Sequence, residues 1–318
     1  MKWQKKGLIY APSKRFEWSQ SHSQVPTVDC VSEKIWRIYY STRDDQNKSN
    51  TSYIEVEAGN PSNILYEHDE KILPLGAPGT FDDCGIMPSW VVNHGGIKYL
   101  FYIGWTTRCS VPYHNSIGLA LSRDGGRTFE KAGEGPLFGP TLNEPFFTGT
   151  SCVLIEGDLW RIWYLSATKW EKIEDKYEPF YHLKYAESND GLNWRRDGIV
   201  AIDYKDADEG AIANASVLKC GGIYHMWYSY RKALGYRSKR SATYRTGYAC
   251  SADGKCWNRC DDKAGIDLSE TGWDSEMIAY PHVVAHQGKL FMFYNGNGFG
   301  ALGFGYAITD KKHLDLGS

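Results

Sequence analysis

The sequence predicts an all-β fold in which one unit of four short strands is repeated five times. Three observations predict it. A strand-like aromatic run recurs at nearly constant spacing, an Asp-Gly turn follows in three of the copies, and no long segment shows the hydrophobic period of an amphipathic helix. The aromatic content of 14% and the 33 glycines agree with strands joined by tight turns.

The aromatic run sets the number of units. Each copy ends on a tyrosine, and these closing tyrosines are Tyr40, Tyr102, Tyr164, Tyr228 and Tyr294, with steps of 62, 62, 64 and 66 residues. A short strand is predicted before each run, at 26–31, 88–92, 150–154, 215–218 and 281–284. A third strand is predicted after each run, at 52–56, 117–122, 183–188, 246–251 and 304–308.

A turn of the form Ser-x-Asp-Gly follows the third strand in three units, at Asp124-Gly125, Asp190-Gly191 and Asp253-Gly254. Glycine supplies the positive φ that a tight turn between extended segments requires. Each turn leads to an aromatic residue, Phe129, Trp194 or Trp257, at which a fourth, outer strand is expected.

The two ends of the chain complement each other. The fifth unit stops near Asp310 without an outer strand, and residues 3–9 resemble the outer-strand segment 194–200. We therefore expect residues near 3–10 to complete the last unit and to cover an otherwise unpaired edge. The predicted fold is a five-bladed β-propeller, closed by an N-terminal strand, in one domain that spans residues 1–318.

Composition excludes several classes of protein. The chain of 318 residues has 36 Lys and Arg against 38 Asp and Glu, so it has no basic footprint for nucleic acid. It contains no apolar stretch of membrane-spanning length, and the N-terminus lacks the apolar run of a secretory signal. We expect a cytoplasmic protein with reduced cysteines and neither nucleic-acid nor membrane partners. The histidines have no metal-ligand spacing, so no cofactor or metal is predicted.

Acidic residues stand just before the first strand in four of the units. They are Asp82, Asp83, Glu144, Glu209 and Glu276, and the first unit has His22 in this region. Because first strands line the channel of a propeller, we expect these groups to meet at one mouth of it. Paired carboxylates serve glycosyl transfer, and crowding raises the pKa of one of them. The alternative is that each acid only caps a turn.

Residues suited to binding a sugar follow the second strands or lie in the connections after them. The candidates are Arg43, Trp105, Tyr113, His114, Arg231, Arg245 and Asn297. Aromatic faces stack on sugar rings, and several arginines near one mouth suit an anion such as phosphate or a sugar carboxylate. The alternatives are core packing for the aromatic residues and surface ion pairs for the arginines.

These features together resemble the five-bladed glycoside hydrolases, which include the arabinanase/xylosidase group (family 43), the invertase/levansucrase group (family 32) and the mannoside phosphorylases (family 130). The phrases Leu75-Gly-x-x-Gly-Thr-Phe-Asp82, Val111-Pro-Tyr-His114 and Trp273-Asp-Ser-Glu276 resemble, more closely, bacterial propeller proteins of surface-polysaccharide gene clusters. The phrases Gln24-Val-Pro-Thr27 and Tyr294-Asn-Gly-Asn-Gly298 do so as well.

The resemblance implies roles for some of the acids. The transition-state-supporting aspartate of the hydrolases falls on Asp82 or Asp83, and their general acid falls on Glu144. Their first-blade aspartate has no counterpart, because Gln20, Ser21 and His22 occupy that region. The phosphorylases also lack this carboxylate, since phosphate is their nucleophile. Here basic residues could hold such an anion, and those at hand are His22, Arg43, His114 and Arg231.

The leading hypothesis is a carbohydrate-active enzyme that acts on a glycosidic bond in the channel mouth, with Glu144 or Asp83 as proton donor and a small-molecule or oligosaccharide substrate. Glu144→Gln is then expected to abolish turnover with little effect on folding. One alternative is a glycoside phosphorylase or transglycosylase that uses bound phosphate or another anion. The other is a non-catalytic sugar-binding propeller.

Overall fold

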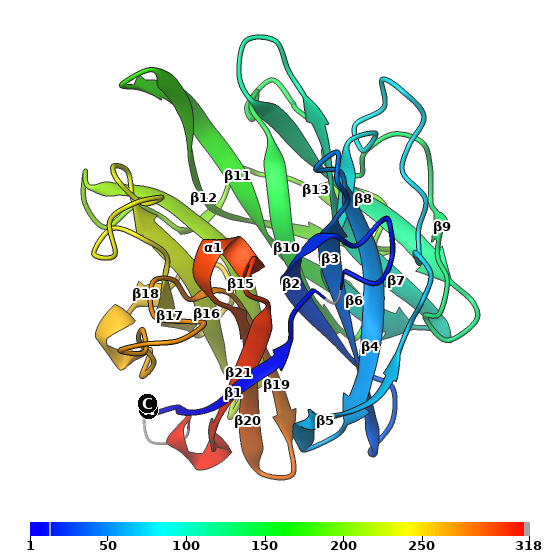
Figure 1. The fold of residues 1–318 in the computed structure, drawn as a ribbon. Helices are drawn as coiled ribbons and strands as arrows, with labels where there is room; N and C mark the ends of the chain where they lie inside the picture. The colour runs from blue at the N-terminus through cyan, green and yellow to red at the C-terminus, as the bar shows by residue number, and fades with distance from the viewer. Residues whose placement is uncertain (13, 315–318) are drawn as a thin grey trace.

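The computed structural model describes residues 1–12 and 14–314, and its regular structure is almost entirely β-strand (Figure 1). Successive strands form antiparallel meanders. The first is β2 (Ser21–Cys30), β3 (Ile35–Arg43), β4 (Ser49–Glu57) and β5 (Asn60–Glu67), and the second is β6 (Gly85–His94), β7 (Ile97–Thr107), β8 (Tyr113–Ser122) and β9 (Glu130–Lys131). The third is β10 (Thr148–Glu156), β11 (Leu159–Ile173), β12 (Lys176–Ser188) and β13 (Trp194–Arg195), with β14 (Val200–Ile202) also paired to β12.

The fourth meander is β15 (Glu209–Cys220), β16 (Ile223–Lys232), β17 (Arg245–Ser251) and β18 (Asn258–Arg259). The fifth is β19 (Ala279–His286), β20 (Lys289–Asn295), β21 (Phe304–Asp310) and β1 (Gln4–Tyr10). The short helices are η1 (Asp261–Lys263), α1 (Asn297–Gly300) and η2 (Lys311–His313). The all-β prediction is confirmed, and each predicted strand coincides with an observed one, usually longer by a few residues.

Strand β1 pairs antiparallel with β21, with Gln4 opposite Ile308 and Tyr10 opposite Phe304. The N-terminal segment therefore supplies the outer strand that the last unit lacks, as predicted. Hydrogen-bonded sheets join neighbouring meanders only weakly. Single parallel contacts connect β4 to β6 at Ser49 and Gly85, and β12 to β15 at Tyr181 and Ala211.

The first strands of the meanders surround a common centre. They contact one another in the cyclic order β2, β6, β10, β15, β19 and back to β2. Side chains connect them as well: Ser89 Oγ donates to the Ser151 carbonyl at 3.1 Å, and the Val283 amide donates to Ser216 Oγ at 2.8 Å. Loops at the ends of these strands can therefore reach one central region.

The Ser-x-Asp-Gly turns join neighbouring meanders. The serine and aspartate side chains hold the turn, as where the Gly191 and Asn193 amides donate to Ser188 Oγ and Asp190 Oδ1. Carbonyls of these turns then accept from aromatic residues of the preceding meander. Tyr39 Oη donates to Gly126 at 2.7 Å, and Trp163 Nε1 donates to Gly254 at 2.8 Å. This explains why the aromatic run and the turn repeat together.

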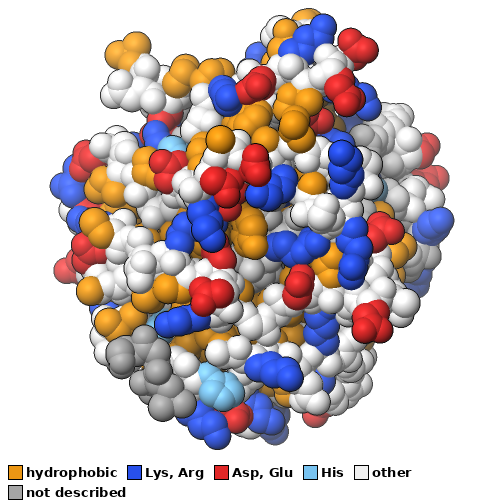
Figure 2. Space-filling model, turned by 90° about the vertical axis from the view of Figure 1, so that its left-hand side faces the viewer, with side chains coloured by type: hydrophobic (Ala, Val, Ile, Leu, Met, Phe, Trp, Pro, Cys, Tyr) orange, Lys and Arg blue, Asp and Glu red, His pale blue; other side chains and the backbone are white. Residues whose placement is uncertain are grey.

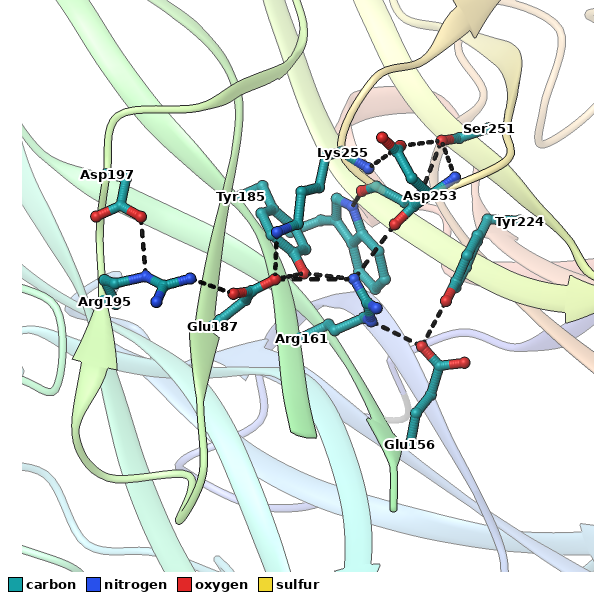
Figure 3. Close-up of polar contacts among 12 residues, drawn as sticks. Glu156, Arg161, Tyr185, Glu187, Arg195, Asp197, Tyr224, Ser251, Asp253 and Lys255 are labelled. Carbon is teal, nitrogen blue, oxygen red and sulfur yellow. Dashed lines mark hydrogen bonds and ion pairs between the residues drawn. The ribbon is translucent and has the colours of Figure 1, made fainter. Parts of the chain in front are cut away.

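A charged network crosses the boundary between the third and fourth meanders (Figure 3). Arg161 lies between two carboxylates, with its Nε 2.7 Å from Glu156 and its Nη1 3.9 Å from Glu187. From the fourth meander, Lys255 Nζ lies 2.7 Å from Glu187, and Tyr224 Oη donates to Glu156. The network ties the two meanders together on the side where their first and second strands are joined.

This network is expected to make stability sensitive to acid. Burial opposes ionisation, yet hydrogen bonds and nearby cations lower the pKa of both Glu156 and Glu187. A carboxyl group whose pKa is lowered by folding stabilises the folded protein at pH values above its unfolded-state pKa of about 4.3. This stabilisation is lost as the pH falls through the folded-state pKa. The melting temperature should therefore drop between about pH 5 and pH 3, and less steeply in Arg161→Met. The exposed arginine variant Arg123→Met is the control; equal slopes in all three proteins would contradict the prediction.

All eight cysteines are free. Within the part of the chain that the structure describes, no helix has the length and apolar character needed to cross a membrane.

Candidate functional site

A small cavity lies at the ends of the first strands, at the centre of the molecule. Its volume is about 80 Å³, and residues of every meander line it: Val25, Met87, Ile103, Tyr113, Asn115, Phe147, Gly149, Thr150, Leu165, Tyr181, Ala213 and Tyr280. This central cavity is mostly aromatic and aliphatic, with a few polar groups, which is the usual composition of a ligand pocket. It has room for several water molecules rather than a whole sugar.

Strained backbone borders the central cavity. Val25, Asn214 and Tyr280 have φ of 53°, 53° and 56°, and each lies within an irregularity of its first strand. Positive φ is a real outlier for a β-branched residue such as Val25. Side chains hold these amides in place: Val25 N donates to Asn295 Oδ1 at 2.7 Å, and Tyr280 N donates to Ser229 Oγ at 2.9 Å. Such strain is typical of ligand sites.

Several of the predicted acids are buried and have polar partners within their own meander. In the second meander, buried Asp82 accepts a hydrogen bond from Tyr102 at 3.0 Å and pairs with Lys131 of β9 at 2.7 Å. In the third, Glu144 accepts from Tyr164 at 2.9 Å and pairs with Arg196 Nη2 at 2.9 Å. In both meanders the acid thus accepts a hydrogen bond from the closing tyrosine and pairs with a cation at the outer strand.

The other meanders follow related arrangements. Glu209 pairs with Arg259 of β18 at 2.8 Å, and Arg259 also pairs with Asp261, which accepts from Tyr228. Asp274 accepts from Tyr294 at 2.9 Å and pairs with Lys5 of β1 at 2.7 Å. None of these acids lines the central cavity. Each of these carboxylates has its partners within its own meander, and the expectation that they gather at the channel mouth stays a prediction.

The surroundings of Glu144 favour the ionised form of its carboxyl group. Burial alone would raise the pKa of its carboxyl group, but Arg196, Ser166 and Lys184 outweigh burial and lower it. The largest causes of this shift are burial and the contacts with Arg196, Ser166 and Lys184. Through its contacts with Arg196, Tyr164 and Ser166, Glu144 connects the outer part of the third meander to its second strand, and its catalytic role stays a prediction.

The remaining predicted acids and His22 lie nearer the surface. Asp83 accepts from the Gly79 amide at 2.8 Å, and although burial opposes it, this bond helps to lower the pKa of Asp83. Glu276 is exposed. Burial and the charge of Arg43 lower the pKa of His22 to about 4, so this imidazole is neutral at physiological pH. Their catalytic roles stay predictions.

Of the predicted binding residues, Tyr113 lines the central cavity. Others have structural partners: Trp105 Nε1 donates to Ser49 Oγ at 3.1 Å, and Asn297 Oδ1 accepts from the Glu276 and Met277 amides. Arg245 donates to the Tyr244 and Arg240 carbonyls and pairs with Asp267 at 3.1 Å.

His114 begins β8 beside Tyr113, and burial together with the charge of Arg108 lowers its pKa. Like His22, it therefore favours the neutral form.

Arg231 is the centre of an arginine–tyrosine cluster, which consists of Arg231, Arg237, Glu178, Tyr181, Tyr236 and Tyr244. The Arg231 guanidinium is 1% exposed and lies 3.6 Å from the Tyr236 ring centroid and 5.5 Å from that of Tyr181. Its Nη2 donates to the Pro179 carbonyl at 2.8 Å. Tyr181 and Tyr244 share a hydrogen bond between their hydroxyls.

The region around Tyr280 is electropositive. Burial raises the pKa of the Tyr280 hydroxyl, with Tyr181 acting in the same direction, while the charges of Arg43, Arg231 and Arg237 act against it. Arg237 pairs with Glu178 at 3.3 Å. Neither Arg43 nor Arg231 forms an ion pair within residues 1–12 and 14–314. The charges of Arg43 and Arg231 thus both act on the cavity-lining Tyr280, and the Glu178 carboxylate interacts electrostatically with Arg231.

Sequence reasoning missed several of these residues, notably Val25, Tyr181, Tyr236 and Tyr280. Phe147 and Tyr181 belong to a ring cluster with Tyr113 at the cavity. A usable signal was the repeated position just before Pro88 and Pro281 at the start of the first strands, where the cavity-lining Met87 and Tyr280 stand. In the described residues, no group of three His, Cys, Asp or Glu side chains is arranged to hold a metal ion.

Comparison with known proteins gives relatives along nearly the whole chain. Uncharacterized protein Rv1502 and Uncharacterized protein MT1551, from two strains of Mycobacterium tuberculosis, are each 36% identical over 311 residues, covering 98% of this chain and 100% of theirs. No protein-family model matches the chain.

Solved structures show the same fold at low sequence identity. A thermostable family-43 glycoside hydrolase superposes with a TM-score of 0.66 at 18% identity, covering 91% of this chain and 88% of its own. A structure from work on the family-130 mannoside phosphorylases and the glycoside hydrolases among them has a TM-score of 0.70 at 14% identity, covering 98% and 94%. A family-32 β-fructofuranosidase of Bombyx mori has a TM-score of 0.60 at 17% identity, covering 91% and 61%. The structural neighbours are thus propeller enzymes of the glycoside hydrolase type, and the predicted resemblance is confirmed.

Proposed function

Because the chain belongs to the family of the two Mycobacterium tuberculosis proteins and has the fold of the propeller glycoside hydrolases, we propose that it binds a carbohydrate at its central mouth and acts there on a glycosidic bond with the help of a bound anion. The observation that carries this proposal is the pair of arginines, Arg43 and Arg231, whose charges act on the cavity-lining Tyr280 and which form no ion pair among the described residues.

We also propose that the meanders are five blades around one axis. The cyclic contacts of β2, β6, β10, β15 and β19 support this arrangement, as does the pairing of β1 with β21. In such a ring the central cavity lies on the axis at one mouth. Its floor then receives groups from every blade, which suits recognition of a ligand from all sides.

The charges favour anion-dependent transfer over simple hydrolysis. Among the described residues no carboxylate lines the central cavity, so they place neither an attacking carboxylate nor a base for water there. A bound phosphate would supply both groups: its oxygen attacks the anomeric carbon, the glycosidic C–O bond breaks, and the phosphate proton passes to the departing oxygen. Arg43 and Arg231 would hold the anion, and Tyr113, Tyr181 and Tyr280 would contact the sugar.

The test is turnover of an oligosaccharide panel with and without inorganic phosphate, with sugar phosphate as the measured product. We expect turnover to require phosphate. Arg43→Ala should raise the KM for phosphate about 10- to 100-fold, because a charge-assisted hydrogen bond to the anion is lost. The matched control is Arg195→Ala on the outer strand β13, where the arginine side chain is 64% exposed and paired with Glu187 and Asp197.

Two results would contradict this proposal. Phosphate-independent release of free sugar would indicate hydrolysis. Calorimetric binding of an oligosaccharide without any product would support the second candidate, a non-catalytic sugar-binding propeller, which the absence of carboxylates from the cavity lining favours.

A further inference from the structure

A second and larger cleft lies outside the central mouth, at the edge of the fourth meander. It has a volume of about 580 Å³, within the usual range of ligand sites. One wall is the end of β16 and the start of β17, and the other is η1 and the segment after it. The lining residues are Tyr230, Arg231, Lys232, Ser241, Thr243, Arg245, Thr246, Asp261, Asp262, Gly265, Ile266 and Asp267. We call it the β17 cleft.

Two buried polar atoms in the lining have no hydrogen-bond partner. Thr246 is 4% exposed and Arg231 is 1% exposed, and both Thr246 Oγ1 and Arg231 Nε lack a partner in the structure. A buried polar group without a partner costs about 1–3 kcal/mol, so native proteins rarely leave one without a reason. Both residues line the β17 cleft, where a bound ligand would offer hydrogen-bond partners to these atoms.

The charges of the β17 cleft balance. Arg231, Lys232 and Arg245 are opposed by three aspartates, at positions 261, 262 and 267. Figure 2 looks onto the side of the molecule on which β17 and β18 lie in Figure 1, and cationic and anionic side chains are interspersed there. Such a lining does not favour a strongly charged ligand, since the aspartates repel an anion and the cations repel a cation.

The apolar part of the lining is small and flat. Tyr230 and Ile266 are half-buried. Gly265 also lines the cleft and has no side chain to cover its own backbone. A ring with hydroxyl groups matches this combination, because its apolar face covers Tyr230 while each hydroxyl donates to a carboxylate and accepts from a cation or from Thr246.

We propose that the β17 cleft is a binding site for a neutral saccharide unit, separate from the central mouth. Arg231 forms a wall shared by the two sites, since its guanidinium also lies against the Tyr236 and Tyr181 rings of the arginine–tyrosine cluster. The cleft therefore holds a sugar residue beside the mouth. The choice of a saccharide rests on the proposed function, whereas binding in the cleft needs no turnover.

The decisive variant is Thr246→Val. Its hydroxyl has no partner in the free protein, so its removal should leave the melting temperature unchanged or raise it. The probes are glucose, galactose, mannose and rhamnose, followed by the amide NMR signals of Thr246 and Gly265. We expect at least one neutral sugar to shift these signals, and Thr246→Val to weaken its binding about 3- to 10-fold. Glucuronate should bind no more tightly than its neutral counterpart.

The matched control is Thr128→Val, which removes an exposed hydroxyl of the second meander that donates to Asp124. It should leave sugar binding unchanged. The inference is overturned if none of the sugars shifts the two signals, if Thr246→Val binds as tightly as the wild type, or if Thr246→Val lowers the melting temperature. Arg43→Ala should keep the cleft signals, so failure of this inference and failure of phosphate-dependent turnover are distinguishable.

Discussion

Replacing Glu144 with alanine is expected to lower the free energy of unfolding by about 3–5 kcal/mol, the usual cost of removing one partner from a buried ion pair. Glu144 is 5% exposed, and its loss leaves Arg196, Tyr164 and Ser166 without their carboxylate partner. Urea unfolding measures this change. The control is Glu171→Ala, an exposed acid on β11 paired with Lys169, which should change stability by less than about 1 kcal/mol.

Glu144→Gln separates the structural from the catalytic interpretation of this residue. The sequence led us to expect normal folding, but the ion pair with Arg196 leads us to expect clear destabilisation, because glutamine leaves the buried guanidinium uncompensated. A variant that unfolds like the wild type yet has lost turnover would restore Glu144 as the proton donor. Activity that falls only in proportion to the folded fraction would support the structural role.

Gly247→Val is expected to destabilise the fold by at least about 1–3 kcal/mol, because it overpacks a filled site. Gly247 lies directly opposite Tyr228 in the pairing of β16 and β17. A Cβ atom at Gly247 would lie closer than 3.0 Å to the Tyr228 ring and to Asp261 Oδ1. The substitution therefore moves the closing tyrosine away from its carboxylate as well as straining the strand.

Gly133→Val is the matched control for Gly247→Val. A Cβ atom at Gly133 meets nothing within 4 Å, and its φ is not positive, so we expect little effect on stability. Thermal unfolding of both variants provides the measurement. Equal melting temperatures for Gly247→Val and the wild type would mean that the tyrosine–carboxylate contact does not hold the meander together.

The fold was predictable because large aromatic residues recur in each unit, and each of them requires a particular partner residue. Tyr102 and Tyr228 each pack their rings over a glycine on the next strand, Gly118 and Gly247, so both members of the pair must recur. The turn carbonyls that bind Tyr39 and Trp163 impose the same repetition on the Asp-Gly turns. Outer strands were harder to locate, since β9, β13 and β18 are two residues long in the structure.

The site was predictable only in part. The sequence around an acid before a first strand does not show which cation that acid pairs with. The cation that binds it comes from a distant part of the chain. Asp82 meets Lys131 and Glu144 meets Arg196 across about fifty residues. Val25 and Tyr280 line the cavity with a positive φ, a backbone conformation that their residue types do not predict. Tyr113 could be predicted because it lies in the connection between the second and third strands of its meander, which the sequence already suggested for binding.

The pairing of Gln4–Tyr10 with Phe304–Asp310 has a consequence for biosynthesis. Because β1 is synthesised before β21, this pair of strands cannot form until β21 has left the ribosome. Until then both complementary edges remain open to capture by a chaperone or by another nascent copy. Formation of this strand pair is therefore a late step in the folding of the fifth meander.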